Sequence, residues 1–347
     1  MLLGTNPEVL HFRVFLFLAK EHAEQYNTYM HEAIIQFANQ LSFKPKLEHG
    51  PVAYHGGPII VSGMGGSNLS SGLLKYYDPT LEIYIHRTYG LPKLHEEVLR
   101  SALLIASSYS GNTEETIDFV HEALGRGLRP VVIASGGKLI ALAEEERLPF
   151  IVLPDDIIQP RVALGVSLIA LATVSGQHAL LKELEKLGKT LDPVAQEREG
   201  KALAEALHGH IPLIYTASEH EALAYIWKIK MNETAKTPAF MNLFPELNHN
   251  EMTGFSGKGP KAPFKLLYLE SMEDSGHLRK RMQVTADLYS SEAMGMVSTK
   301  LLGTTRIERA MRSLLVADFT AYHLALMYNV DPAGVPVVEE FKRRIAR

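Results

Sequence analysis

The sequence predicts an α/β protein in which two doubly wound parallel sheets follow each other in tandem. Its length of 347 residues favours two domains, at about 150 residues for each. From residue 58 onward, short β-branched runs alternate with amphipathic stretches, which is typical of a parallel sheet between layers of helices. A charged stretch interrupts this alternation at residues 180–200, and the same plan then starts again.

The first unit is expected to contain five strands and three helices. Each helix begins just after a turn that contains Gly or Ser, and ligands of such sheets bind at the carboxyl ends of the strands. Residues 1–50 have a mostly helical pattern and are expected to flank this sheet. The predicted strands are 59–62, 81–85, 102–106, 131–134 and 150–153, and the predicted helices are 67–76, 113–126 and 138–146.

The second unit is expected to begin with a strand at residues 211–216. Ser218, with Glu221 three residues later, forms a capping-box sequence that predicts a helix through about Met231. Further strands are predicted at 264–269 and 294–298, and a long amphipathic helix at 304–328. The predicted organisation is a first domain at 1–179, a helical connection at 180–200, and a second domain with a C-terminal helix at 201–347.

Composition excludes several classes of protein. Charged residues make up 21% and hydrophobic residues 46% of the chain, so a folded core is expected. The net charge of −4 lacks the basic excess of nucleic-acid-binding proteins, and no nucleic-acid partner is expected. The absence of cysteine excludes disulfides, thiol nucleophiles and cysteine-ligated metals.

Neither a membrane span nor a signal peptide is predicted. The longest mostly apolar run, residues 162–174, is shorter than the roughly 20 residues that cross a bilayer. The apolar residues 14–19 follow Arg13 and do not fit a signal peptide. The cytoplasm is therefore the expected location, and no membrane partner is expected.

A glycine-rich turn, Gly-Met-Gly-Gly-Ser-Asn at residues 63–68, follows the first predicted strand. Glycines let backbone amides approach an anion, and the start of the next helix adds positive charge. Asn68 takes the place of the third glycine of a dinucleotide fingerprint, so a dinucleotide is not indicated. Taken alone, this turn fits a ligand-free connection equally well.

A second turn, Ser-Ser-Tyr-Ser-Gly-Asn-Thr-Glu-Glu-Thr at residues 107–116, follows the third predicted strand. The hydroxyls of Ser108, Ser110 and Thr113 and the amides around Gly111 can surround a phosphomonoester without a lysine. Hydroxyl-rich turns are often only helix caps, but this number of hydroxyls at a strand end favours a ligand. Because no Walker sequence for nucleoside triphosphates occurs, a sugar phosphate is the predicted ligand.

The two turns together resemble the sugar isomerase (SIS) domain, a flavodoxin-like unit that binds phosphosugars. Asn232-Glu233 is followed by Pro-Glu-Leu-Asn-His-Asn-Glu at residues 245–251, which places His249 16 residues after Glu233. This pattern is similar to that of the bifunctional phosphoglucose/phosphomannose isomerase family, in which two SIS domains occur in tandem. The resemblance extends from about residue 58 to the end of the chain.

The resemblance implies the residues of an active site. Arg161 matches the family's arginine near the reacting carbons, Glu233 its base, and His249 its ring-opening acid and base. Because relatives share this site across a dimer interface, with the histidine coming from the neighbouring subunit, a homodimer is implied. The implied substrate-binding residues are Gly65, Gly66, Ser67, Ser108, Ser110, Thr113 and Lys342.

Aldose–ketose isomerisation requires these residue types on chemical grounds. Opening a cyclic hemiacetal needs a proton donor and acceptor near neutral pH, a role that fits His249. Moving a proton between C2 and C1 through an enediolate needs a carboxylate and a cation, which Glu233 and Arg161 supply. This route needs no metal and no cofactor. The sequence has no zinc motif, since His208 and His210 lie too close along a predicted loop.

Other interpretations stay open from the residues alone. With Lys230 and Lys236 three residues away on either side, Glu233 also fits a solvated ion-pairing residue. Arg161 also fits the solvent-exposed start of a helix, and Glu246 and Glu251 are candidates for orienting His249. The alternative functions are a non-catalytic phosphosugar-binding protein and an isomerase of amino-sugar or pentose phosphates.

One departure from the family concerns the tail between Asp331 and Lys342. A threonine near the sugar is expected there, but this segment contains neither Ser nor Thr. Glucose-phosphate isomerisation is therefore predicted more strongly than tolerance of both C2 epimers. A lost hydrogen bond of about 1 kcal/mol would weaken the mannose reaction by at most about tenfold.

Overall fold

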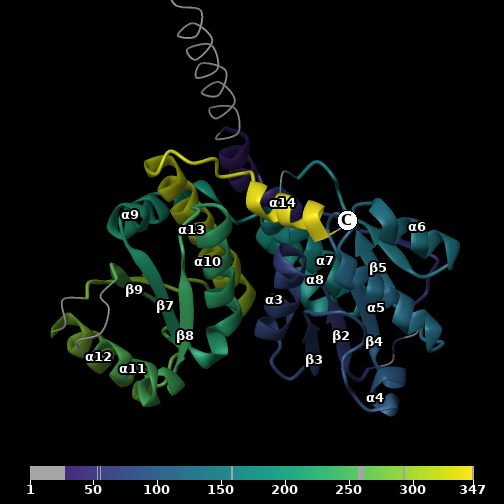
Figure 1. Ribbon diagram of the computed structural model, residues 1–347, viewed down its shortest axis with the longest axis horizontal. Coiled ribbons are helices and arrows are strands. Elements are labelled where there is room, and N and C mark those ends of the chain that lie inside the picture. Colours follow the sequence, from purple (N-terminus) through teal and green to yellow (C-terminus); the bar gives the residue numbers. More distant parts are fainter. Residues whose placement is uncertain are drawn as a thin grey trace, which may run out of the picture.

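Two parallel sheets, one in each half of the chain, form the framework of the protein (Figure 1). They are seen in a computed structural model that describes residues 28–345 except 53, 55, 158, 257–261 and 292–293. The predicted pair of doubly wound sheets is confirmed. The exact domain limits stay a prediction, and helices run across both predicted ends of the 180–200 connection.

The first sheet has the strand order β1-β6-β5-β4-β2-β3. Its pairs are parallel, except that the two-residue strand β1 runs antiparallel to β6. The order reverses between β2 and β4, which opens a crevice at their carboxyl ends. The strands are β1 (Leu47–Glu48), β2 (Ile59–Ser62), β3 (Ile83–His86), β4 (Leu103–Ser107), β5 (Val131–Ala134) and β6 (Phe150–Val152).

Helices cover both faces of the first sheet because its central strands are apolar on both sides. Ile60 packs with α4, α5 and α6, whereas its neighbours Ile59 and Val61 pack with α3 and α7, as the alternation of side chains along a strand requires. The helices are α2 (Phe37–Gln40), α3 (Leu69–Tyr77), α4 (Glu96–Ser101), α5 (Glu114–Gly125), α6 (Gly137–Glu145), α7 (Leu164–Val174) and α8 (His178–Gly188).

The second sheet has the order β10-β9-β7-β8, with every pair parallel. Its order reverses between β7 and β9. The strands are β7 (Ile211–Ala217), β8 (Phe240–Phe244), β9 (Phe264–Glu270) and β10 (Met296–Lys300). The helices of this half are α9 (Glu197–Leu207), α10 (Glu221–Glu233), α11 (Glu251–Phe255), α12 (Gly276–Ser291), α13 (Arg306–Met327) and α14 (Pro336–Ile345).

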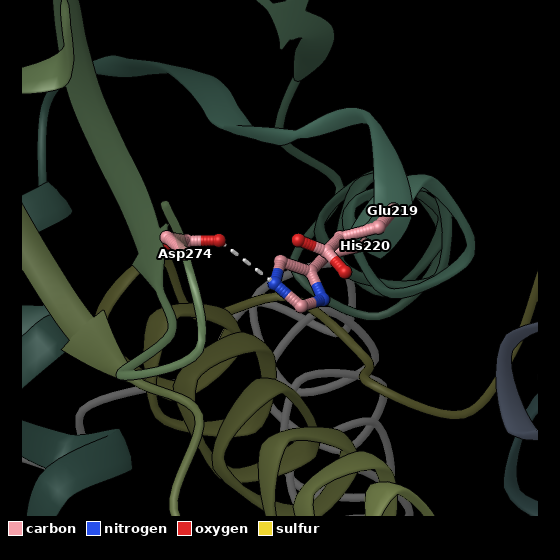
Figure 2. Close-up of side chains that lie close together, drawn as sticks. All are labelled: Glu219, His220 and Asp274. Atoms are coloured by element: carbon pink, nitrogen blue, oxygen red, sulfur yellow. Dashed lines mark hydrogen bonds and ion pairs between the residues drawn. The ribbon is translucent and has the colours of Figure 1, made fainter. Parts of the chain in front are cut away.

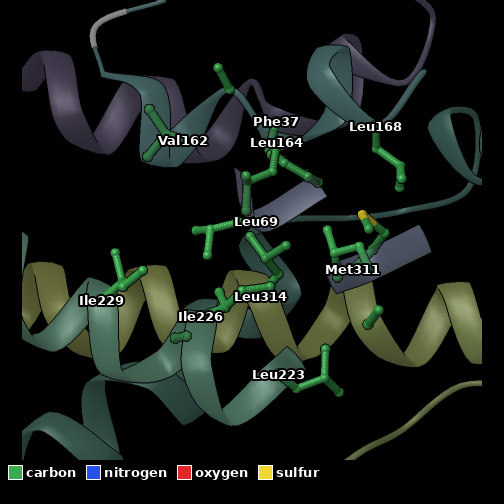
Figure 3. Close-up of a cluster of buried hydrophobic side chains, with 14 of the residues drawn as sticks. Phe37, Leu69, Val162, Leu164, Leu168, Leu223, Ile226, Ile229, Met311 and Leu314 are labelled. Carbon is green, nitrogen blue, oxygen red and sulfur yellow. The ribbon is translucent and has the colours of Figure 1, made fainter. Parts of the chain in front are cut away.

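A single hydrophobic core joins the two halves. Side chains of α3 and α7 meet those of α10 and α13 in this core, as Figure 3 shows for Leu69, Leu164, Ile226 and Leu314. Within the second half, the buried Trp227 of α10 donates its indole N–H to Ser313 Oγ of α13 at 2.9 Å. This packing fixes the end of α10 in the second half against the first half of the chain.

Most predicted elements lie within two residues of the observed ones, but three differences have physical causes. The capping box is wrong, because Ser218 Oγ donates to the carbonyl of Phe244 at 2.7 Å instead of capping α10. The edge strand β8 was not predicted, since its sequence Phe-Met-Asn-Leu-Phe lacks β-branched residues and a clear alternation. β10 begins two residues later than predicted, at Met296, which pairs with Leu266 of β9.

The N-terminal flank is helical at residues 28–35 and in α2, in agreement with the prediction. The predicted helical residues before these, and the apolar residues 14–19, lie outside the described residues. Within the described residues, no helix has both the length and the apolar character to cross a bilayer.

Candidate active site

The hydroxyl turn between β4 and α5 lies at the carboxyl edge of the first sheet. Ser108 is buried, and its Oγ lies 2.7 Å from Thr113 Oγ1 across the turn. Gly111 makes this turn possible, since it has a φ of 67° and a Cβ atom there would lie 1.8 Å from the carbonyl oxygen of Gly136. The exposed Ser110 accepts the Asn112 N–H at 3.3 Å. The predicted hydroxyls therefore gather at the N-terminus of α5.

The glycine turn lies directly beside the hydroxyl turn. Residues Gly65–Asn68 form a short 3₁₀ helix after β2, with Gly65 at a φ of 51°. Ser67 Oγ accepts the backbone N–H of Tyr109 at 2.8 Å, and the carbonyl of Ser67 accepts the Ser107 hydroxyl at 3.1 Å. The structure thus brings together the two turns that the sequence singled out.

Arg161 lies against the glycine turn, in the 3₁₀ helix Pro160–Val162 that precedes α7. A Cβ atom on Gly66 would lie 2.8 Å from the backbone nitrogen of Arg161, so a side chain at Gly66 would push these segments apart. Arg161 is 1% exposed. The alternative that it faces solvent at a helix start is therefore wrong.

Protein atoms accept hydrogen bonds from all three nitrogens of the Arg161 guanidinium, five bonds in total. Nε donates to Thr234 Oγ1 at 2.9 Å, and Nη2 donates to the carbonyls of Pro332 and Ala333 at 2.6 and 2.9 Å. Nη1 makes the two longest contacts, 3.3 Å to Gln159 Oε1 and 3.4 Å to Glu233 Oε2. Arg161 therefore ties the chain's tail to the end of α10 beside the glycine turn.

One face of α10 supplies the residues around Arg161. Lys230 and Glu233 lie three residues apart on this face, and Thr234 follows directly. Lys230 is completely buried, and its Nζ donates to the carbonyl of Arg161 at 3.0 Å and to the carboxylate of Asp318 on α13. Glu233 is a third exposed and pairs with Arg161. The interpretation of Glu233 as a solvated partner of two lysines is wrong.

Burial and opposite charges act against each other in this cluster. Burial lowers the pKa of Arg161, while the charges of Glu233 and Asp318 counteract the shift. Burial likewise lowers the pKa of Lys230 and raises that of Asp318, and the ion pair between them opposes both changes. The result is a paired set of charges with one carboxylate, Glu233, open to solvent.

His249 is not brought to Glu233 within one chain. It is exposed and ends the short helix Glu246–His249, which follows the carboxyl end of β8. Because β7 and β8 are parallel and α10 joins them, Glu233 lies at the opposite end of this unit. The 13 residues of α10 span about 20 Å. In Figure 1, α11, which follows His249, lies at the bottom of the view. Helix α14, which follows the tail carbonyls bound by Arg161, lies near the top.

The residues flanking His249 bind elsewhere. Glu251 accepts hydrogen bonds from Tyr215 and Asn242, and Glu246 accepts one from Asn250 at 2.9 Å. The structure gives no contact of either carboxylate with His249 among the residues it describes.

Comparison with known proteins shows the family of the chain. Residues 196–345 match the model of the bacterial phospho-glucose isomerase C-terminal SIS domain. The bifunctional phosphoglucose/phosphomannose isomerase of Aquifex aeolicus (strain VF5) is 32% identical over 297 residues, which cover 83% of this chain and 90% of that protein. The chain belongs to the bifunctional phosphoglucose/phosphomannose isomerase family. The resemblance inferred from its motifs is thereby confirmed.

Two further comparisons give a relative with a different name and a solved structure of similar fold. The D-glucosamine-6-phosphate 4-epimerase of Sulfolobus acidocaldarius is 30% identical over 291 residues, covering 82% of this chain and 88% of that protein. A crystal structure of a hypothetical protein from Thermus thermophilus superimposes with a TM-score of 0.64 at 19% identity, covering 94% of this chain and 88% of that one. The second likeness concerns the fold alone.

Lys342 lies on α14, which begins three residues after Ala333, and its side chain is exposed. The carbonyls of Pro332 and Ala333, held by Arg161, fix the start of this segment. The segment between Asp331 and Lys342 contains neither Ser nor Thr, so the expected departure from the family concerns this part of the tail.

A group of metal-ligand type lies at the edge of the second sheet (Figure 2). Glu219, His220 and Asp274 each offer an atom within 4.8 Å of the others. Asp274 Oδ1 lies 3.1 Å from His220 Nε2, and Glu219 pairs with Arg306 at 3.3 Å. These groups thus have partners in the chain, at the opposite end of α10 from Glu233. Of the two histidines weighed in the sequence, His210 contacts the carbonyl of His208 through Nδ1 at 2.9 Å.

Some residues of the candidate site were not predicted from the sequence of this isomerase-family protein. The sequence interpretation treated Lys230 as a surface residue and did not single out Thr234, Asp318 or Gln159. The spacing of Lys230 and Glu233 on one helical face was a signal, but the acceptor of Lys230 lies 88 residues away on α13. A contact between helices so far apart in the chain has no local sequence pattern.

Proposed function

We propose that the protein interconverts glucose 6-phosphate and mannose 6-phosphate with fructose 6-phosphate through an enediolate. One observation carries the proposal: the partly exposed carboxylate of Glu233 lies 3.4 Å from the buried guanidinium of Arg161, beside the glycine turn. In such a pair, the carboxylate can transfer the proton and the fixed cation can stabilise the oxyanion that develops. Family membership supports this reaction.

The substrate's phosphate belongs, in this proposal, at the hydroxyl turn. Ser108, Ser110 and Thr113 would hold its oxygens, and the first backbone amides of α5 would add their dipoles. Gly65, Gly66 and Ser67 would line the path from the phosphate to the sugar. The reacting carbons then come to lie at Glu233, which takes the proton from C2 and returns it to C1.

We propose a homodimer in which the partner copy supplies His249. The support is that His249 and Glu233 lie at opposite ends of the unit that α10 spans, about 20 Å apart. A single chain therefore holds the base without the group that opens the sugar ring, and a second copy completes the site. Lys342 on α14 is proposed to contact the ring oxygen. Because charged sugar phosphates do not cross a bilayer unaided, we place the reaction in the cytoplasm.

A second candidate substrate class is the amino-sugar phosphates. It is favoured by the likeness to the D-glucosamine-6-phosphate 4-epimerase, which is 30% identical to this chain over 291 residues. The same hydroxyl turn would take the phosphate of glucosamine 6-phosphate. A non-catalytic binding protein is disfavoured, because it would have no need of a carboxylate held beside a buried arginine.

The test is a coupled assay with glucose 6-phosphate, mannose 6-phosphate, glucosamine 6-phosphate and arabinose 5-phosphate, with and without EDTA. We expect turnover of the first two, unaffected by EDTA. Glu233→Gln should lower kcat by about 10²- to 10⁴-fold, the range of a general base, with binding of fructose 6-phosphate retained. Glu221→Gln, at the exposed start of the same helix, is the control.

The shared site is tested by mixing Glu233→Gln with His249→Asn under conditions of proven subunit exchange. A mixed dimer contains one site with both native groups, so partial activity should return. Near-normal turnover by Glu233→Gln would refute the proposed base. Failure of the mixed variants to regain activity would refute the site shared between subunits.

A further inference from the structure

Lys236, three residues beyond the end of α10, has a backbone that favours glycine. Its φ is 52°, in the left-handed region that side chains with a Cβ seldom adopt. Helices commonly end on such a residue, and it is usually glycine. Non-glycine residues in this region persist only where the surrounding structure holds them, and they cluster at functional sites. The Lys236 ammonium folds back and donates a hydrogen bond to the carbonyl of Glu233, the proposed base.

The hydrogen-bond donors around Glu233 are unequally available. All three nitrogens of the Arg161 guanidinium are bonded to protein acceptors. The Lys236 ammonium has three donors and gives one of them to the Glu233 carbonyl. Among the described residues, no other hydrogen bond of this ammonium is formed. Lys236 therefore has donors left for a ligand, whereas every Arg161 nitrogen already has a protein acceptor.

Three charged groups from three segments face Lys236. They are Arg161 before α7, Glu233 at the end of α10, and Asp331 in the tail. Lys236 is exposed at the surface, but partial desolvation of its ammonium and the positive charge of Arg161 lower its pKa to about 8, while Asp331 and Glu233 oppose the shift. Asp331 is itself fixed in a turn, because it accepts the N–H groups of Ala333 and Gly334 at 2.8 and 3.0 Å. An anion bound beside Glu233 would favour the protonated, positively charged form of Lys236.

We propose that Lys236 is a further catalytic residue of this site. When the sugar phosphate binds, its ammonium exchanges the Glu233 carbonyl for the oxygen that carries the negative charge of the enediolate. Lys236 keeps its proton throughout, and its role is electrostatic. The inference rests on the proposed function. It assigns to Lys236 a stabilisation of the oxyanion that Arg161, whose nitrogens all have protein acceptors, can give only through Nη1.

The test compares Lys236→Gly, Lys236→Arg and Lys182→Met, the last a control at an exposed lysine of α8. Glycine relieves the left-handed backbone, so Lys236→Gly should unfold at the same temperature as the wild type or at a higher one. Its kcat should nevertheless fall by about 100-fold, as when one oxyanion donor is removed. KM should change by less than about threefold, because the phosphate is held at Ser108 and Thr113.

The pH profile separates a catalytic from a structural role. In the wild type, kcat/KM should fall above about pH 8 as Lys236 of the free enzyme loses its proton. Arginine stays charged at any accessible pH, so Lys236→Arg should regain at least a tenth of the wild-type kcat without this basic limb. Lys182→Met should match the wild type in every measurement.

Lys236→Gly with a kcat within threefold of the wild type would overturn this inference and leave the proposed function intact. A loss of kcat that follows loss of folded protein would overturn it as well, since Lys236 would then be only a helix cap. A wild-type chain that isomerises none of the sugar phosphates would overturn both proposals.

Discussion

The carboxyl edges of the two sheets share a topology and differ in what fills them. At the first edge, between β2 and β4, the hydroxyls of Ser108 and Thr113 face each other across a turn. At the second edge, between β7 and β9, the buried carboxylate of Asp274 occupies the turn after β9. Its Oδ2 accepts the N–H of Ser271 at 2.9 Å, and its Oδ1 lies 3.1 Å from His220 Nε2.

The difference teaches that the doubly wound fold provides two crevices and the side chains decide their use. A dianion at the second edge would meet the negative charge of Asp274, whereas at the first it meets hydroxyls and the start of α5. The second half instead contributes α10, whose far end brings Glu233 to Arg161 of the first half. We therefore expect changes at the first edge to alter catalysis and changes at the second to alter stability.

The largest expected effect at the first edge is that of Gly66→Ala. The added Cβ would lie 2.8 Å from the backbone nitrogen of Arg161 and force this segment away from Glu233. Displacing a catalytic group by about 1 Å costs on the order of 100-fold in rate, and kcat/KM should fall by that amount. Gly125→Ala at the end of α5, where a Cβ meets nothing within 4 Å, is the steady-state kinetic control. Equal activities of the two variants would refute this contact.

A smaller effect is expected from removing the hydroxyls. Ser108→Ala and Thr113→Val each take away a hydrogen bond to a charged phosphate, worth about 1.5–3 kcal/mol. KM for fructose 6-phosphate should rise roughly 10- to 100-fold, with kcat within a few-fold of the wild type. Ser218→Ala removes a hydroxyl from the second edge, where it bonds Phe244 at 2.7 Å, and should leave KM unchanged. If Ser218→Ala raised KM as much as Ser108→Ala does, the claim that only the first edge binds the phosphate would be refuted.

The smallest catalytic effect is expected from Asp274→Asn at the second edge. The substitution leaves His220 or the Ser271 N–H without its charged acceptor, which should reduce the free energy of unfolding by about 1–3 kcal/mol. Urea denaturation measures this loss, and KM and kcat of the folded variant should stay within twofold of the wild type. A variant of full stability and altered KM would mean that the second edge takes part in binding.

Much of the fold could be predicted because its signals are local. The buried strands Ile59–Ser62 and Val131–Ala134 coincide with the predicted ranges, since runs of β-branched residues between turns are explicit in the sequence. The edge strand Phe240–Phe244 escaped prediction because its sequence lacks β-branched residues, so that its strand conformation depends on pairing with β7. The capping function of Ser218 failed for a similar reason, since a carbonyl of the neighbouring strand competes for its hydroxyl.

The candidate site was predictable where one segment carries the chemistry. The two turns after β2 and β4 have recognisable compositions, and the structure brings them together through Ser67 and Tyr109. The surroundings of Glu233 were not predictable, because Lys230 bonds Asp318 and Arg161 bonds the carbonyls of Pro332 and Ala333. These partners lie 88 to 172 residues apart in the chain, and those of Arg161 meet it only when the two halves pack.

The central claim is that the first edge alone holds the phosphate, so that the sugar reaches Glu233. A crystal structure of the protein with fructose 6-phosphate tests it most directly. We expect the phosphorus atom against the hydroxyls of Ser108 and Thr113, with C1 and C2 within about 3.5 Å of the Glu233 carboxylate. Phosphorus bound at the turn around Asp274, or sugar carbons remote from Glu233, would contradict the account.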